Sequence, residues 1–203
     1  MAEMFHQGNR ELQDRFDSRR LADRLAERSA ERSICIRDDD RDFIQARDMV
    51  FVATADGDGR PNCSYKGGDP GFVRVVDAHT VAFPSYDGNG MYISTGNTLV
   101  NPHVGLLFID MEAGRRLRLN GEASIDPADP LLPEYPGAEF IVRVRAREIF
   151  ANCPRYIHTY TLVKRSQYVP HADVETPEPE WKRSDWAREV LPGTDPTRPV
   201  TDR

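Results

Sequence analysis

Apolar and polar residues alternate with the period of a β-strand through the middle of the chain, from residue 49 to residue 150. Each alternating or continuous apolar run predicts a strand. These runs lie at 49–55, 60–66, 72–77, 80–86, 103–110, 115–125 and 138–150. The segment 89–102 interrupts them and is compatible with a short helix. Short turns join the runs without regular crossover helices, so the pattern predicts an antiparallel sheet or barrel with peripheral helices.

A helical period replaces the alternation in the first 48 residues, which carry many charges of both signs. Two pairs of apolar residues stand four apart, at 12 and 16 and at 21 and 25, so each pair shares a helical face. This predicts two short helices that break near Asp17–Ser18, with Asp17 as the cap of the second. A third helix is predicted at 39–48. The arm is either a salt-bridged surface element or a segment that wraps a second subunit.

The pattern divides the chain into three parts: a charged helical N-terminal arm at 1–38, a barrel domain at 39–168, and a proline-rich C-terminal arm at 169–203. Of the 203 residues, 39% are hydrophobic, and most of these lie in the middle part. That part is therefore expected to bury a core without the help of disulfide bonds or structural metal ions.

Charge and composition exclude several classes of protein. The net charge of −6 and the pI near 5.4 argue against nucleic-acid binding. No run approaches the ~20 apolar residues of a membrane span, and the N-terminus lacks an apolar signal core. Three scattered cysteines suggest neither a disulfide framework nor a metal site. A cytoplasmic protein is expected.

The segment SYKGGDPGF at 64–72 places a hydroxyl, a phenol and a lysine ahead of paired glycines. It suits an anion, but it is neither a P-loop nor a dinucleotide-binding turn, because the lysine precedes the glycines and a strand follows. Lys66 is a point charge suited to an anion, and the hydroxyl of Ser64 adds a donor. Cys63 is expected to face the barrel interior, and His103 is expected to be a core group.

Five motifs in this order resemble the pyridoxamine 5′-phosphate oxidase-like superfamily of FMN-binding split barrels, and most closely its branch of predicted flavin-nucleotide-binding proteins. They are DGRPNCSYKGG, GFVRVVD, TVAFPSYDGNG, NTLVNPHVGLLFID and RLRLNGEA, and the resemblance covers residues 40 to 165. It implies a split antiparallel β-barrel, FMN as cofactor, and a homodimer with flavin sites at the subunit interface. An oxidoreductase acting on a small molecule is the implied activity.

The resemblance also implies that Lys66 and Ser64 hold the flavin phosphate from a strand, with no helix N-terminus required. It further implies which residues contact the cofactor. They are Ser64, Tyr65, Lys66, Gly67, Phe83, Pro84, Ser85, Asn89, Asn97 and Arg116. Gly67 and its neighbour Gly68 would let backbone amides approach a ligand, and Asn89 would start the following helix. Asn97 and Asn101 are read either as part of this site or as caps and turn residues. Arg116 is either a phosphate ligand or part of a solvated strand face.

The segment NCPRYIHTY clusters Arg155, Tyr156 and His158, which are the candidate catalytic residues for an anionic or quinone-like acceptor, unless the segment is a structural turn. The oxidases proper use a C-terminal Arg-Leu-x-Pro segment for their substrate phosphate, and this sequence contains none. We therefore expect a substrate other than pyridoxamine phosphate. The alternatives are a flavin store or sensor without turnover, and a barrel that binds haem or a deazaflavin. His158 and His171 would then be the candidate axial ligands of the haem.

Overall fold

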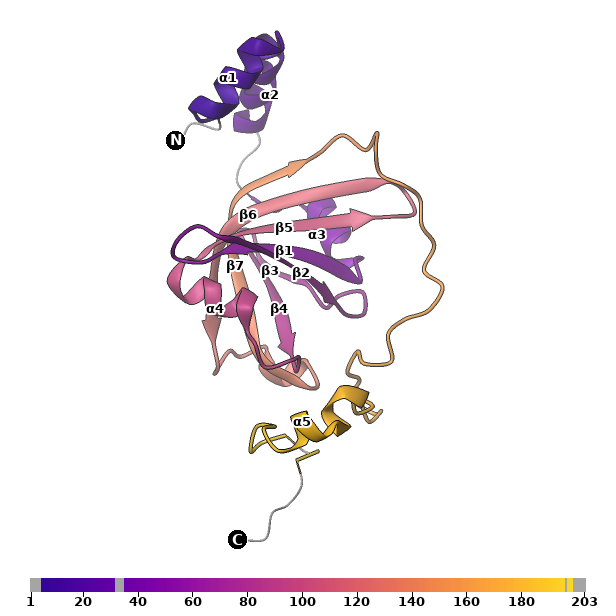
Figure 1. Cartoon of the computed structure of the whole chain (residues 1–203). Helices are drawn as coiled ribbons and strands as arrows, with labels where there is room; N and C mark the ends of the chain where they lie inside the picture. The colour runs from indigo at the N-terminus through magenta and orange to yellow at the C-terminus, as the bar shows by residue number, and fades with distance from the viewer. Residues whose placement is uncertain (1–4, 32–34, 196, 199–203) are drawn as a thin grey trace. The chain divides into compact units, whose positions relative to one another are not determined.

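One antiparallel sheet of seven strands, in the order β2-β1-β5-β6-β7-β4-β3, forms the body of the protein (Figure 1). The computed structural model describes residues 5–31, 35–195 and 197–198. The strands are β1 (Met49–Ala55), β2 (Pro61–Gly67), β3 (Arg74–Asp77), β4 (Thr80–Tyr86), β5 (His103–Asp110), β6 (Arg115–Asp126) and β7 (Ala138–Ala151). The sheet curls into a split barrel, which confirms the predicted fold class.

The alternation of the strands decides what fills the barrel. Leu117 and Leu119 of β6 are buried, and they pair with Phe108 and Leu106 of β5 on the inner face. The arginines that alternate with these leucines, at 116 and 118, point to the outer face. The same core includes Phe83 of β4, and all five of these side chains are at most 5% exposed.

A β-bulge opposite Gly121 interrupts the pairing of β6 and β7, which extends from Leu117 to Asp126 of β6. The register between the two strands shifts at Asn120/Gly121. A Cβ atom at Gly121 would lie 2.2 Å from the carbonyl oxygen of Arg145, so only glycine permits this approach of the two backbones.

Helix α3 (Asp38–Gln45) leads into the barrel, and its fully buried Ile44 belongs to the core. The N-terminal arm forms α1 (Gln7–Arg15) and α2 (Arg19–Glu31), as predicted. Asp17 does not cap α2: it takes a left-handed φ of 50°, and the amide of Ala22 donates to the carbonyl of Ser18. Ser18 therefore holds the N-cap position, because the residue before it makes the turn that ends α1.

Two expectations about single residues are wrong. Cys63 is exposed on the outer face of β2, because its neighbours Asn62 and Ser64 take the inner positions. His103 is also exposed: it opens β5 one residue before the buried Val104, so the alternation turns it outward, where its Nδ1 lies 3.9 Å from Glu122.

The chain separates into two compact units, Met1–Thr161 and Leu162–Arg203. The second contains a 3₁₀ turn (Glu180–Arg183) and the short helix α5 (Asp185–Arg188). Its interior holds an ion pair: Lys182 Nζ lies 2.7 Å from Asp195 Oδ2, and both side chains are 5% exposed. No helix in the described part of the chain has the length and apolar character needed to cross a membrane.

The ion pair makes the second unit sensitive to one substitution. Desolvation alone would raise the pKa of Asp195, but hydrogen bonds from Lys182 and Thr197 lower it to about 2. This stabilisation is therefore present at neutral pH, above the ordinary pKa of ~3.9, and is lost only as the pH falls through about 2.

We predict that Asp195→Asn destabilises the second unit by about 1.5–3 kcal/mol, because Lys182 loses its charged partner. Both tryptophans of the chain, Trp181 and Trp186, lie in this unit and stack on each other. Urea unfolding followed by tryptophan fluorescence should show an earlier transition, while Glu189→Gln, at an exposed carboxylate, should leave it unchanged. Identical midpoints for both variants would contradict the prediction.

Candidate functional site

Three polar side chains point from β2 into the open end of the barrel. Asn62, Ser64 and Lys66 occupy alternate positions of β2, so they share one face. Ser64 pairs with Val52 and Lys66 with Val50, and both valines belong to the core. The polar row thus continues the apolar inner face at an edge strand of the sheet.

Helix α4 (Ile93–Val100) brings further hydroxyl groups to this row. Ser94 Oγ is in hydrogen-bond contact with Ser64 Oγ and also accepts from Asn62 Nδ2 at 3.0 Å. Asn97 Nδ2 donates to Thr54 Oγ1 on β1 at 3.1 Å and ties the helix to the sheet. The first turn of α4 therefore lies beside the polar row of β2, and the backbone amides of that turn add positive potential there.

A pocket of ≈ 210 Å³ lies between these elements. Its wall comes from the polar row of β2, from the end of β4 with the following loop, and from the start of α4. Asn89 shapes the loop, because its Oδ1 accepts the amide of Met91 at 3.1 Å. Ser85, Tyr86 and Thr95 complete the polar part of the lining. One ammonium group, several hydroxyls and a helix N-terminus together suit a small anion.

Burial of Lys66 lowers the pKa of its ammonium group, and Glu139 partly opposes this effect. Glu139 also accepts a hydrogen bond of 2.7 Å from the phenol of Tyr92, which raises the pKa of that phenol. Lys66 therefore gains from any anion that enters the pocket, because an anion would replace part of its lost hydration.

The structure brings four of the ten predicted cofactor contacts to this pocket: Ser64, Lys66, Ser85 and Asn89. The other six do not line it. Tyr65 projects from the opposite face of β2 and meets Phe51 edge-on, and Phe83 fills the core. Gly67, Pro84, Asn97 and Arg116 also lie outside the lining.

Some polar residues have structural roles that differ from the predicted ones. Asn89 does not start α4, because Tyr92 holds the N-cap position. Asn101 is the C-cap of that helix, which fits the reading of it as a cap. The amide of Gly68 is occupied by the carbonyl of Asp48, and a Cβ atom at Gly68 would lie 2.5 Å from the ring of Phe72. Packing of that ring requires this glycine.

Sequence reasoning missed Asn62, Tyr92, Ser94 and Thr95. Asn62 could have been found, since it stands two residues before Ser64 on the same strand and therefore on the same face. The other three lie at the start of α4, where Tyr92 is the N-cap, so a helix N-terminus lines this pocket although the sequence reading required none.

Arg155, Tyr156 and His158 lie together on an irregular coil after β7, and all three are exposed. Arg116 Nη2 donates to the carbonyl of Cys153 at 2.9 Å and holds the start of the coil. Arg155 Nε donates to Cys153 Sγ at 3.0 Å, and its guanidinium lies over the Tyr156 ring. None of these residues lines the pocket.

Residues 36–171 match the family model described as pyridoxamine 5′-phosphate oxidase. A comparison with curated proteins gives no match.

Three similar solved structures are HupZ of Group A Streptococcus, an FMN-binding protein from Syntrophomonas wolfei, and HutZ, the haem storage protein of Vibrio cholerae. HupZ is 19% identical, with 56% of this chain and 91% of that chain covered and a TM-score of 0.45. The Syntrophomonas protein is 12% identical, with 67% of this chain and 95% of that chain covered and a TM-score of 0.45. HutZ is 23% identical, with 53% of this chain and 88% of that chain covered and a TM-score of 0.39. With TM-scores below 0.5, these likenesses carry no functional argument.

The lowered pKa of Lys66 predicts how the pocket binds anions at different pH. As the pH rises, Lys66 loses its proton before an ordinary lysine would, near ~10.4, so the affinity for inorganic phosphate should fall early on the alkaline side. Calorimetric titrations with phosphate at increasing pH measure this. Lys66→Arg keeps its charge throughout and should show no such fall. Parallel profiles for the two proteins would contradict the assignment.

Proposed function

The chain belongs to the pyridoxamine 5′-phosphate oxidase family, and on this basis we propose that it is an FMN-binding flavoprotein that acts as an oxidoreductase on a small molecule. The observation that carries the proposal is the pocket around Lys66. It offers one cation and several hydroxyl donors, from Ser64, Ser94 and Thr95, to one terminal phosphate. No glycine-rich turn for a pyrophosphate accompanies it in the sequence, which favours FMN over FAD.

The residues present fit the phosphate end of FMN. Lys66 is half-buried with a lowered pKa, so a phosphate dianion would restore a counter-charge to it. The hydroxyls of Ser64 and Ser94 already converge at one point beside it. FMN would supply the hydride or electron chemistry, while the protein supplies position and electrostatics. In the proposed enzyme, Lys66 and these hydroxyls bind and orient, whereas Arg155, Tyr156 and His158 are the groups offered to a substrate.

A flavin store or sensor would use the same pocket without turnover, and the test of substrate reduction below separates it from the enzyme. A haem barrel needs an axial ligand. His158 and His171 are its candidates, but neither is among the residues that line the pocket in the described chain. The polar lining thus favours a phosphate-bearing cofactor such as FMN, or a deazaflavin.

We also propose that the protein is a homodimer with its flavin sites at the subunit interface. A pocket of ≈ 210 Å³ is smaller than the ~300–1,000 Å³ typical of sites that enclose a whole ligand. It can enclose the phosphate end of FMN, and the flat ring system needs a second wall. A second subunit would supply that wall.

We predict that the purified protein is yellow and releases FMN, rather than FAD, on denaturation. Lys66→Met should weaken FMN binding ~10- to 100-fold, since a charge-assisted contact contributes about 1.5–3 kcal/mol. Fluorescence titration of the apoprotein with FMN measures this. Lys164→Met makes the same change of charge at an exposed lysine and should leave the affinity unaltered. A colourless protein that fails to bind added FMN would refute the function.

A further prediction concerns the substrate. Conversion of pyridoxamine phosphate to pyridoxal phosphate should be negligible, because the sequence lacks the Arg-Leu-x-Pro segment of the oxidases. Arg155→Ala and His158→Ala should instead impair the reduction of quinone-like acceptors while FMN stays bound. Absorbance assays measure the rates of pyridoxal phosphate formation and of acceptor reduction. Robust pyridoxal phosphate formation, or full acceptor reduction by both variants, would show the respective half to be wrong.

A further inference from the structure

The wall of the pocket beside α4 carries a single charged side chain. The buried side chains of α4 are Ser94, Thr95 and Thr98, whereas Leu99, at 75% exposure, turns outward. The helix thus reverses the usual arrangement, in which the apolar stripe faces the core. Its inner face contributes neutral hydroxyl groups, and of the described residues that line the pocket only Lys66 is charged. A carboxylate close to Lys66 therefore has a large effect on which anions can enter.

A β-bulge brings one carboxylate to the rim of this pocket. Ser85 of β4 pairs with Phe140 of β7. The next residue, Tyr86, pairs with Ala138, which leaves Glu139 between them with no residue opposite it. Bulges redirect a side chain from the regular alternation and are frequent beside active sites. Since Ser85 and Tyr86 both line the pocket, the irregular strand places Glu139 next to pocket residues.

Two contacts of Tyr92, the N-cap of α4, hold Glu139 at the rim. The phenol of Tyr92 donates to Glu139 Oε1 at 2.7 Å, and its ring packs on Phe140 with the centroids 6.3 Å apart. Tyr92 has a left-handed φ of 46°, which large side chains seldom adopt, so these contacts offset backbone strain. Oε2 of Glu139 has no hydrogen-bond partner in the described part of the chain.

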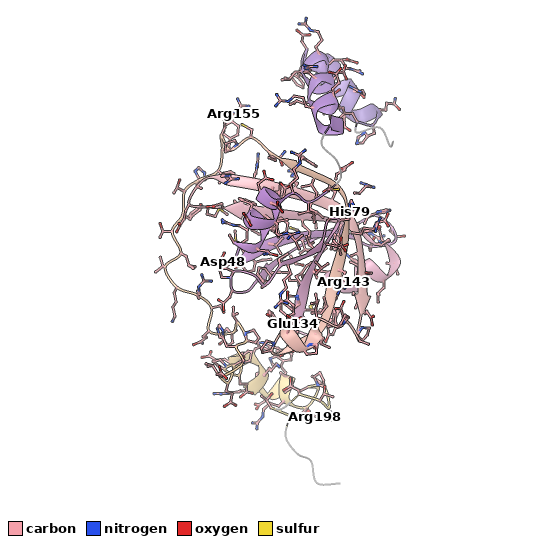
Figure 2. The ribbon with its side chains drawn as sticks, turned by 180° about the vertical axis from the view of Figure 1, so that it is seen from behind. Asp48, His79, Glu134, Arg143, Arg155 and Arg198 are labelled. Atoms are coloured by element: carbon pink, nitrogen blue, oxygen red, sulfur yellow. The ribbon has the colours of Figure 1, made fainter. Side chains whose placement is uncertain are left out.

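The charge of Glu139 acts on Lys66. Burial lowers the pKa of the ammonium group, and the negative charge of Glu139 raises it. The same charge repels an anion that approaches Lys66. Arg155 does not offset this repulsion within one chain, because Figure 2 shows it on the side of the barrel away from α4, which is labelled in Figure 1. A ligand that also donates a hydrogen bond to Oε2 would instead gain a charge-assisted contact.

We propose that Glu139 is a specificity-determining residue of the pocket. It disfavours inorganic phosphate and favours a phosphate ester that carries a hydroxyl group close to the phosphate. Discrimination then comes from a repulsive and an attractive element of one carboxylate. This inference rests on the proposed function, because the ribityl chain of FMN carries hydroxyl groups next to its phosphate. Glu139 would keep free phosphate from competing for the site.

Calorimetric titrations of the full-length protein, freed of bound flavin, test this at neutral pH. The ligands are inorganic phosphate, methyl phosphate, which has no hydroxyl on its carbon, and glycerol 3-phosphate, which has hydroxyls beside the phosphate. Wild type should prefer glycerol 3-phosphate to methyl phosphate. Glu139→Gln should bind inorganic and methyl phosphate about 2- to 5-fold more tightly, because the repulsion is gone. Its preference for glycerol 3-phosphate should fall ~5-fold, because a neutral acceptor binds a hydroxyl more weakly.

The substitution separates this role from a structural one. Glutamine can still accept the hydrogen bond of Tyr92, so a residue that only holds α4 in place would leave every affinity unchanged. Glu112→Gln removes the same charge at the exposed β5–β6 turn and should have no effect.

Three outcomes would overturn the inference: an equal preference in wild type and Glu139→Gln, weaker binding of methyl phosphate by that variant, or a wild-type protein that binds none of the three ligands. FMN is titrated separately. The expected results with the phosphate esters, together with no binding of FMN, would refute only the flavin function.

Discussion

A single curved sheet can enclose a core only if the side chains on its inner face are predominantly apolar wherever strands lie opposite one another. Phe83, Phe108, Leu106 and Leu119 meet this requirement. The requirement ends at β2, which pairs with β1 on one side and is the last strand of the sheet on the other. Lys66 can stand on the inner face only there, so the place where the sheet stops determines the place of the pocket.

The strands were predictable because their alternation is a local property. A strand with one buried and one solvent-exposed face alternates apolar and polar residues with a period of two, wherever it lies in the fold. All seven predicted strands are present. The positions of Ser64 and Lys66 agree with this period, and the same period places Tyr65 on the opposite face of β2, since adjacent residues of a strand point to opposite faces. The period of two along β2 places Cys63 and Tyr65 on the outer face and Asn62 on the inner face with Ser64 and Lys66.

The part played by α4 was not predictable in the same way. A reading of hydrophobic residues assigns the apolar side of a helix to the core, and α4 does the opposite. Arg116 shows a related limit. The sequence left it open whether Arg116 is a phosphate ligand or part of a solvated strand face. In the structure it donates to the carbonyl of Cys153, a residue 37 positions away. Contacts between distant segments leave no period in the sequence, so only the folded chain reveals them.

The reversed polarity of α4 also bears on how this protein can change. Replacing Thr98 or Ser94 by an apolar residue would turn the helix into an ordinary amphipathic one and could add packing to the barrel. The same replacement at Ser94 would remove a hydroxyl from the pocket. The buried face of this helix thus keeps polar side chains, of which Ser94 and Thr95 line the pocket, in place of apolar packing. Stability is commonly lower where residues serve a site. Engineering for thermal tolerance should therefore leave these buried hydroxyls in place and seek its gains elsewhere in the sheet.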